Sequence, residues 1–185
     1  MIVITRARSK TELEAIAALQ QANLKKNITP EEAAGQGFLT AEYSLQVLEE
    51  MHLQEPAIIA LDGDKLAGYA LVTTKTIRDC HPLVTELFNA IDQLEYKQVP
   101  LKQLNYVVVG QLCVGKGYRG QGLARHLYNH FRDSLAEKYP YCLTDVATAN
   151  QRSLTAHKHA GFKVIHNIEY SGLGWEIVLW DWRQD

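Results

Sequence analysis

The chain has 185 residues, of which 46% are hydrophobic and 22% are charged, and its formal net charge is −2. This length suits one domain of roughly 100–200 residues, so we expect a single domain over residues 1–185. The charge balance gives no overall attraction to nucleic acid or to an anionic membrane. No apolar run approaches the roughly 20 residues that span a bilayer, and residues 1–6 are too short for a signal-peptide core.

The three cysteines are widely spaced, odd in number and form no CxxC pair; they are Cys80, Cys113 and Cys142. This usage argues against a disulfide framework and against a zinc site, and it fits a reducing compartment. We therefore expect a cytoplasmic protein that has no nucleic-acid partner, no membrane partner and no metal.

Strand and helix signals alternate along the chain, so the fold class is α/β or α+β. Ser9 and Glu12 form a capping box that opens the first helix, and Pro30 opens a second one. In chain order, the expected elements are a strand at 2–6, helices after Ser9 and Pro30, a helix at 41–52, a β-hairpin at 56–61 and 65–74, a helix at 82–95, a buried strand at 106–114, a helix at 123–138, a strand at 141–147, a helix at 150–160, and strands at about 162–170 and 174–182.

Residues 112–124, LCVGKGYRGQGLA, place a glycine-rich turn between a buried strand and a helix. Glycines let the backbone turn sharply and bring its N–H groups against a ligand. The start of the helix adds free N–H groups and a positive dipole end. Together these features make a phosphate-binding cradle, with Lys116, Arg119 and Arg125 as nearby positive charges.

This turn has two alternative interpretations. Residues 115–120 also match GxGxxG, the dinucleotide fingerprint, and Asp145 follows at a suitable distance. Too few residues follow Gly120 to build the rest of a dinucleotide-binding sheet, so a nicotinamide oxidoreductase is a weaker hypothesis. A solvated turn without a ligand is the second alternative, and the density of glycines beside cations argues against it.

The segment YRGQGLA at 118–124 resembles the pyrophosphate motif of the GNAT superfamily of N-acyltransferases. The wider family motif begins with Gln or Arg, and Gly117 stands there in this chain. A second segment, NQRSLTAHKHAGF at 150–162, is similar to the family's motif Asn-x-x-Ala/Ser-x-x-Leu/Phe-Tyr-x-x-x-Gly-Phe. The two motifs stand in the family's order and spacing, and the match covers about residues 104–165.

The resemblance implies a GNAT fold, with a mixed central sheet of about seven strands, splayed between the two central strands, and helices on both faces. It implies acetyl-CoA as co-substrate and a primary amine of a small molecule or peptide as acceptor, acetylated by direct attack in a ternary complex. A homodimer is left open. The implied cofactor-binding residues are Leu112, Cys113, Val114, Gly117, Tyr118, Arg119, Gly120, Gln121, Gly122, Leu123, Ala124, Asn150 and Ser153. The amide near Leu112 is expected to polarise the thioester carbonyl, and the Arg119 side chain to reach a phosphate.

Two residues are candidates for proton transfer. His157 stands where the family often has the tyrosine that protonates the departing thiolate; the alternative is a histidine of the core. Asp145 stands five residues before Asn150, where some GNAT branches have a glutamate base. An aspartate is shorter and is expected to act through water; the alternative is a structural carboxylate paired with Arg or Lys.

Residues 27–64 contain acidic side chains but no Lys or Arg. The resemblance places part of this region beside the acceptor, so an acidic rim for a cationic amine is one hypothesis, and a solvated acidic helix face is the other. The alternative function for the whole chain is a non-catalytic module that binds acyl-CoA.

Overall fold

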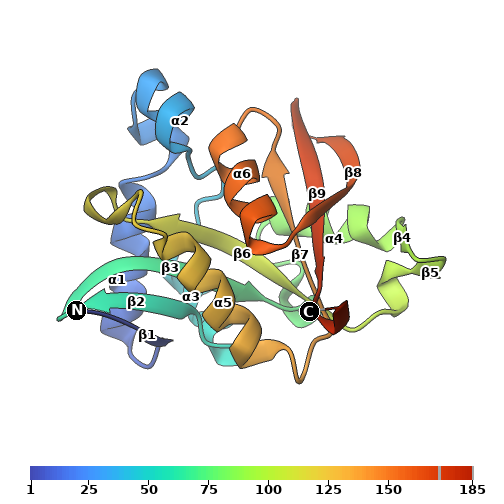
Figure 1. Cartoon of the computed structure of the whole chain (residues 1–185), viewed down its shortest axis with the longest axis horizontal. Coiled ribbons are helices and arrows are strands. Elements are labelled where there is room, and N and C mark those ends of the chain that lie inside the picture. Colours follow the sequence, from blue (N-terminus) through green and yellow to red (C-terminus); the bar gives the residue numbers. More distant parts are fainter. Residues whose placement is uncertain (171, 185) are drawn as a thin grey trace.

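A computed structural model describes residues 1–170 and 172–184. Its centre is a seven-stranded sheet in the order β1-β2-β3-β6-β7-β9-β8 (Figure 1). Neighbouring strands are antiparallel except for the central pair, β6 and β7, which is parallel. The strands are β1 (Ile2–Arg6), β2 (Ile58–Asp62), β3 (Lys65–Thr73), β6 (Tyr106–Val114), β7 (Tyr141–Ala147), β8 (Lys163–Tyr170) and β9 (Leu173–Asp181). The predicted mixed sheet is confirmed, and its antiparallel pairs exclude the parallel sheet of a dinucleotide-binding fold.

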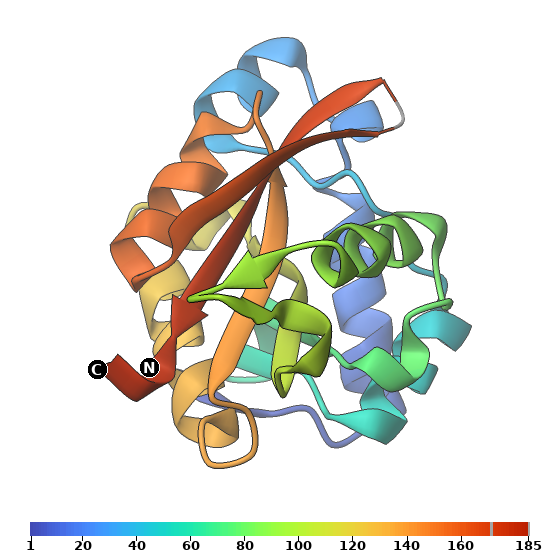
Figure 2. The ribbon, with the colours of Figure 1, turned by 90° about the vertical axis from the view of Figure 1, so that its right-hand side faces the viewer.

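Helices cover both faces of this sheet, as predicted (Figure 2). One face carries α1 (Lys10–Gln21), α3 (Leu45–Gln54) and α4 (Pro82–Asp92), and the other carries α5 (Leu123–Leu135) and α6 (Gln151–Ala160). The short helix α2 (Pro30–Gln36) lies beside α6 at one end of the molecule (Figure 1). The predicted capping box is present, since Ser9 accepts from the amide of Glu12 and the Glu12 carboxylate accepts from the amide of Ser9.

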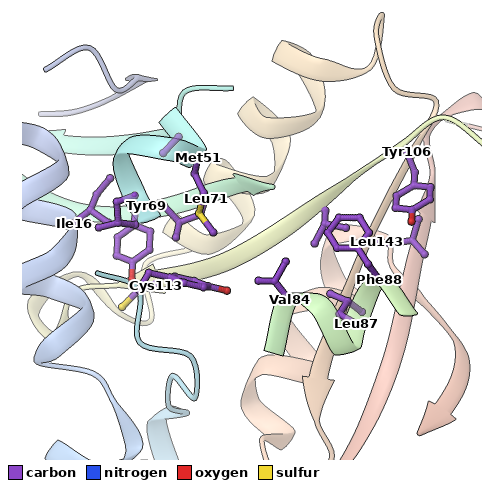
Figure 3. Packing of buried hydrophobic residues seen from close by; sticks show 14 of the residues in the cluster. Ile16, Met51, Tyr69, Leu71, Val84, Leu87, Phe88, Tyr106, Cys113 and Leu143 are labelled. Atoms are coloured by element: carbon purple, nitrogen blue, oxygen red, sulfur yellow. The ribbon is translucent and has the colours of Figure 1, made fainter. Parts of the chain in front are cut away.

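The sheet separates two hydrophobic clusters, because successive side chains of a strand point to opposite faces. On β3, Tyr69 and Leu71 pack under α1 and α3, whereas Ala70 and Val72 pack under α5. Figure 3 shows the first cluster, in which Tyr69 and Leu71 lie near Met51 of α3. Both clusters are drawn from residues that are almost fully buried, so the central strands are anchored from either side.

Three predicted helix boundaries differ from the structure. The helix expected at 41–52 begins only at Leu45, because Ser44 caps it with its hydroxyl, and residues 41–43 have no regular secondary structure. The helix expected at 123–138 ends at Leu135. The helix expected at 82–95 ends at Asp92, and residues beyond it form a small hairpin of β4 (Glu95–Tyr96) and β5 (Val99–Pro100) that the sequence analysis missed.

The two central strands diverge after a short pairing. β6 and β7 pair only where Tyr106–Val108 face Tyr141–Leu143, and β6 then continues to Val114 without contacting β7 in the ladder. The register between β3 and β6 shifts at this point, which leaves Gly110 as a bulge between Val109 and Gln111. A bulge bends its strand and terminates pairing. The splay that the family resemblance implied is therefore present, and it opens the centre of the sheet.

Candidate active site

A cleft of about 820 Å³ enters the sheet where β6 and β7 diverge. It runs from the start of α5, along the open edge of β6, to side chains of α4 and of the β8–β9 hairpin. Most of the residues predicted to bind the cofactor line it. They are Leu112, Cys113, Val114, Tyr118, Arg119, Gly120, Gly122, Leu123, Ala124, Asn150 and Ser153. Gly117 and Gln121 belong to the same loop but do not line the cleft.

Free backbone amides gather at the glycine-rich end of the cleft. Helix α5 begins after Gly122, a residue in the left-handed region at φ 76° that offers no side-chain cap, so the amides of the first turn remain unbonded within the helix. Within the described part of the chain, the amides of Gly120, Gln121 and Gly122 also have no hydrogen-bond acceptor. This arrangement of N–H groups at a helix start is suited to an anion such as a phosphate.

The Arg119 side chain does not point to this end as a free cation. Its guanidinium donates to Glu32 of α2 at 3.2 Å, to the Val114 carbonyl at 3.2 Å and to Asn23. Lys116 also pairs with Glu32, at 3.2 Å. The expectation that the Arg119 side chain reaches a phosphate is therefore not what the structure shows, because three acceptors already hold it. Glu32 thereby ties α2 to the glycine-rich loop.

Open backbone groups continue along β6. The Val109 carbonyl, at the end of the pairing with β7, accepts the Thr144 hydroxyl at 2.8 Å. Beyond that point β6 has a partner on the β3 side only, so its edge toward the cleft is unpaired as far as Val114. An unpaired strand edge binds extended amide-containing ligands through main-chain hydrogen bonds.

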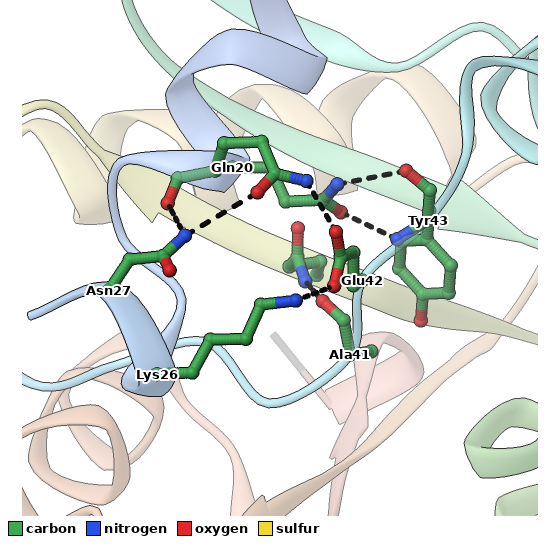
Figure 4. Close-up of polar contacts among 8 residues, drawn as sticks. Gln20, Lys26, Asn27, Ala41, Glu42 and Tyr43 are labelled. Carbon is green, nitrogen blue, oxygen red and sulfur yellow. Dashed lines mark hydrogen bonds and ion pairs between the residues drawn. The ribbon is translucent and has the colours of Figure 1, made fainter.

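Gly110 and Gln111 are held from the opposite side by the segment that precedes α3. The Tyr43 hydroxyl donates to the Gly110 carbonyl at 3.1 Å, and the side-chain amide of Gln111 donates to the Ala41 carbonyl at 2.8 Å. Gln20 of α1, which is fully buried, exchanges two hydrogen bonds with the backbone of Tyr43, at 2.9 and 3.0 Å (Figure 4). The wall formed by residues 41–43 is thus fixed to both the sheet and α1.

Asp145 lies on β7, where the cleft passes the splay. Asp145 as a whole is partly exposed, and its carboxylate accepts a hydrogen bond from the Tyr170 hydroxyl of β8. Burial raises the pKa of the Asp145 carboxyl to about 6, and the bond from Tyr170 opposes that rise. At neutral pH the group is mostly ionised, and no Lys or Arg among the described residues pairs with it. The alternative of a carboxylate paired with a cation is not what the structure shows.

His157 is buried in the wall of the cleft, 7% exposed. Its Nδ1 lies 2.8 Å from the Ser153 carbonyl oxygen, which can only accept, so Nδ1 carries the proton. Its Nε2 lies 2.7 Å from the Tyr128 hydroxyl and accepts from it. Burial lowers the pKa of the imidazole to about 4, so the ring is neutral at physiological pH. Both ring nitrogens are occupied by partners within the protein.

Cys113 also lines the cleft, but it is not poised as a nucleophile. Its side chain is 5% exposed, and burial raises the pKa of the thiol to about 12. The reactive form of a cysteine is the thiolate, which is scarce at neutral pH when the pKa is this high. The site therefore favours chemistry that does not pass through an acyl-cysteine.

The lining of the cleft near Asp145 is largely apolar, and its polar side chains include Gln111, Thr144, Tyr43 and Tyr170. The rings of Tyr170 and Trp175 stack at 4.8 Å. Across from them α4 contributes the apolar residues Leu83, Val84 and Leu87. None of the acidic residues expected to form a rim lines the cleft; Glu32 and Glu42 are instead paired with cations. The alternative of a solvated, ion-paired acidic surface is the better description of residues 27–64.

Comparison with known proteins agrees with this geometry. Residues 31–162 match the acetyltransferase (GNAT) family. The chain belongs to this family.

Solved structures similar to this chain share its fold. A chain of the NatC complex bound to Gag peptide and CoA is 16% identical, with a TM-score of 0.67 and coverage of 97% of this chain and 98% of that one. The ribosomal-protein-S18-alanine N-acetyltransferase from Escherichia coli is 15% identical, with a TM-score of 0.64 and coverage of 98% and 94%. The protein yncA from Salmonella typhimurium, with its cofactor acetyl-CoA, is 15% identical, with a TM-score of 0.63 and coverage of 98% of this chain and 94% of that one. No curated protein sequence matches the chain.

In this GNAT protein, three residues that the sequence motifs do not predict also line the cleft. Tyr128, Tyr43 and Tyr170 place hydroxyl groups at His157, at Gly110 and at Asp145 respectively. Tyr128 was detectable only as a residue one turn before Phe131 on an amphipathic helix. Tyr43 and Tyr170 reach the cleft from segments distant in sequence, so spacing alone held no signal for them.

Two further observations on the GNAT chain concern metal ions and membranes. Across residues 1–170 and 172–184, no group of three or more His, Cys, Asp or Glu side chains is arranged to hold a metal ion, and His126 and His130 of α5 have no third ligand. None of the helices in that part of the chain is long and apolar enough to cross a membrane.

Proposed function

We propose that this GNAT protein is an N-acetyltransferase that moves an acetyl group from acetyl-CoA to a primary amine by direct attack in a ternary complex. The observation that carries the proposal is one continuous cleft with three consecutive environments. It begins at uncapped amides of α5, follows the unpaired edge of β6 and ends at the ionised carboxylate of Asp145.

The cofactor-binding residues fit a CoA thioester in order. The amides from Gly120 to Ala124 suit the pyrophosphate, since they are free donors at a helix start. The open edge of β6 suits the amide-containing pantetheine arm, and the backbone N–H near Leu112 suits the thioester oxygen. Asn150 caps α6 and donates to the Phe38 carbonyl, so it joins α6 to the segment beyond α2. The resemblance to acetyl-CoA and CoA complexes of the same fold agrees with this assignment.

Asp145 is the proposed general base. An amine must be neutral to attack, and a lysine-like amine has a pKa near ~10.4. Its nitrogen becomes positively charged and acidic as the N–C bond forms. A carboxylate with a pKa of about 6 can then accept the proton, directly or through water.

His157 is proposed to act on the leaving-group side, with Tyr128. A thiol has a pKa near ~8.5, so the departing thiolate needs little help. The neutral ring keeps the Tyr128 hydroxyl oriented through Nε2. We therefore expect replacement of His157 to lower turnover by a smaller factor than replacement of Asp145.

The remaining parts of the proposal are coarser. We infer one domain over residues 1–185, a cytoplasmic location and an acceptor that is a small molecule or a peptide, and we leave a homodimer open. The peptide option is supported by likeness to the NatC chain, whose structure contains a Gag peptide. The cysteines Cys80, Cys113 and Cys142 are all free, which agrees with a reducing compartment.

The test is release of free CoA thiol from acetyl-CoA in the presence of a panel of primary amines. The proposed function predicts release that depends on the amine, and a strong reduction in Asp145→Asn. The alternative is a non-catalytic module that binds acyl-CoA. It would be established by calorimetric binding of acetyl-CoA without thiol release for any amine.

A further inference from the structure

The charges that line the cleft are sharply divided between its two ends. The cationic residues Arg119, Arg125 and Arg152 belong to the glycine-rich loop or to the first turns of α5 and α6. The single carboxylate among the described lining residues is Asp145, at the other end. Arg119 is moreover held by Glu32 and Asn23, which keeps it at the phosphate end.

The acceptor end is walled by apolar surface. Leu83, Val84 and Leu87 of α4 line this end. Val84 and Leu87 are 4% exposed each and belong to the hydrophobic cluster of Figure 3. The Tyr170–Trp175 stack lines the same cleft, and its ring planes are parallel within 1°. Stacked aromatic and aliphatic surfaces take apolar or aromatic groups, because the gain comes from removing apolar area from water.

The polar side chains that line this end, which include Gln111 and Thr144, have partners within the protein, and none of them is a cation. The Tyr170 hydroxyl donates to Asp145, and the Tyr43 hydroxyl donates to the Gly110 carbonyl. An acceptor that carries a carboxylate near its amine would meet the negative charge of Asp145 without a cation to compensate it. Buried charges without a partner are strongly unfavourable.

We infer that the acceptor is a primary amine on an apolar body that carries no carboxylate: an arylalkylamine, or the N-terminus of a peptide whose first side chains are apolar. Free amino acids are excluded by the same chemistry. This inference rests on the proposed function, because it names the substrate class of the transfer site.

The test compares kcat/KM for phenethylamine with kcat/KM for phenylalanine in the thiol-release assay. The two share the same ring and chain length and differ by the carboxylate. Phenethylamine is the more basic amine, so fewer of its molecules are neutral, and a preference for it cannot arise from amine basicity. We expect at least a 100-fold preference for phenethylamine over phenylalanine. Equal or better use of phenylalanine would overturn the inference.

Two further arms separate the sources of the amine. A peptide amide that begins with Leu is compared with one that begins with Asp, and each is compared with phenethylamine. The inference predicts that the Leu peptide exceeds the Asp peptide by at least 10-fold. Whichever of the Leu peptide and phenethylamine has the higher kcat/KM identifies the source, and a better Asp peptide contradicts the apolar acceptor end.

A variant tests the charge argument within the chain. Leu83→Arg brings a cation to the α4 wall and is expected to shift the phenylalanine-to-phenethylamine ratio at least 10-fold toward phenylalanine. A damaged fold would lower both rates without moving their ratio. Leu53→Arg is the matched control, because Leu53 is 80% exposed on α3 and does not line the cleft. An unchanged ratio in Leu83→Arg would count against the inference.

Failure of the proposed function gives a different result. If acetyl-CoA binds but no amine releases thiol, the transfer reaction is wrong. The acceptor inference is then decided by calorimetric titration of phenethylamine and phenylalanine into the CoA-bound protein. Binding of phenethylamine alone supports the apolar acceptor end, and binding of neither amine or of phenylalanine overturns it.

Discussion

The pair of Asp145 and Tyr170 controls proton acceptance in the proposed reaction. Burial raises the pKa of Asp145 to about 6, while the hydrogen bond from Tyr170 favours the ionised form and lowers it. The acid limb of the pH–rate profile should therefore have its midpoint near 6. Tyr170→Phe removes the donor, so the pKa of Asp145 should rise and the acid limb should move to higher pH. The measurement is kcat/KM against pH from 5 to 9, and a limb that stays in place or moves to lower pH would contradict this role.

Asp145 also links activity to stability. Its folded-state pKa of about 6 lies above its ordinary value of 3.8, so the folded protein binds this proton more tightly than the unfolded chain. Below about pH 4, ionisation of Asp145 does not lower the free energy of unfolding. The loss of free energy grows as pH rises to about 6, and it is complete above that. Asp145→Asn should thus stabilise the protein at pH 7.5 by up to about 3 kcal/mol, at roughly 1.4 kcal/mol per pKa unit. The measurement is the free energy of unfolding of both proteins in urea at pH 7.5 and at pH 4. An equal increase in the variant at both pH values would rule out ionisation as the cause.

His157 should remain neutral across the physiological range. Burial lowers the pKa of its imidazole to about 4, and its two nitrogens are occupied by the Ser153 carbonyl and the Tyr128 hydroxyl. Nitrogen-detected NMR should show the Nδ1–H tautomer with no titration between pH 5 and 8. Titration of His157 near its ordinary pKa would show that the ring is solvated and free to donate.

For these residues the sequence could predict where the side chains lie, but not which groups they form hydrogen bonds with. The spacing of the second motif placed His157 and Asp145 beside the cleft. Their hydrogen-bond partners were inaccessible to the same reasoning, because Tyr128 and Tyr170 are brought in by helix packing and by the β8–β9 hairpin. The partners of the Arg119 side chain were inaccessible for a similar reason, since Asn23 and Glu32 lie far away in sequence.

Among the elements, strand β6 depends on a single glycine for its bulge. A Cβ at Gly110 would lie 2.2 Å from the Thr73 hydroxyl oxygen, which is too close for any side chain. Gly110→Ala should therefore destabilise the protein, by an overpacking cost of about 1–3 kcal/mol or more, and lower the affinity for acetyl-CoA by disturbing the splay. Gly35→Ala is the control, because a Cβ there meets nothing within 4 Å and Gly35 lies within helix α2. Chemical denaturation should show a loss for the first variant and none for the second.

Element positions followed from local signals where those signals were strong. The capping box, the Asp62–Asp64 turn and the run of buried residues from Tyr106 to Val109 gave the first helix, the hairpin and β6 correctly. The β4–β5 hairpin was missed because its turn residues, Lys97 and Gln98, are not turn formers, yet both adopt positive φ. Lys97 is held there by an ion pair with Asp181 of β9, a contact that no local pattern encodes.

Taken as a whole molecule, the sheet consists of two halves that share little backbone pairing. The half containing β1, β2, β3 and β6 meets the half containing β7, β9 and β8 only over Tyr106–Val108. The cleft occupies the remainder of this boundary, and its wall includes residues of both halves. A ligand that fills the cleft therefore contacts both halves at once. The family resemblance predicted this layout; composition and periodicity alone gave only an α/β or α+β class.

Binding of acetyl-CoA across this boundary should raise the melting temperature of the whole protein. A ligand at 100 times its Kd stabilises the folded state by about 2.7 kcal/mol, and a protein of this size gains roughly 2–4 °C per kcal/mol. We expect a shift of about 5–10 °C with acetyl-CoA and none with NAD at the same concentration. Ala124→Glu should abolish the shift, because Ala124 lines the cleft in the first turn of α5 and a carboxylate there would repel the pyrophosphate.

The fold of Ala124→Glu should survive, since an acidic side chain in the first turn of a helix is favourable. Ala124→Gln is the matched variant, equal in size and uncharged, and it should retain part of the shift. The difference between the two variants isolates the charge of the cradle from its shape. If Ala124→Glu kept the full shift with acetyl-CoA, the pyrophosphate would have to lie elsewhere in the cleft, and the assignment of the residues from Gly120 to Ala124 would be wrong.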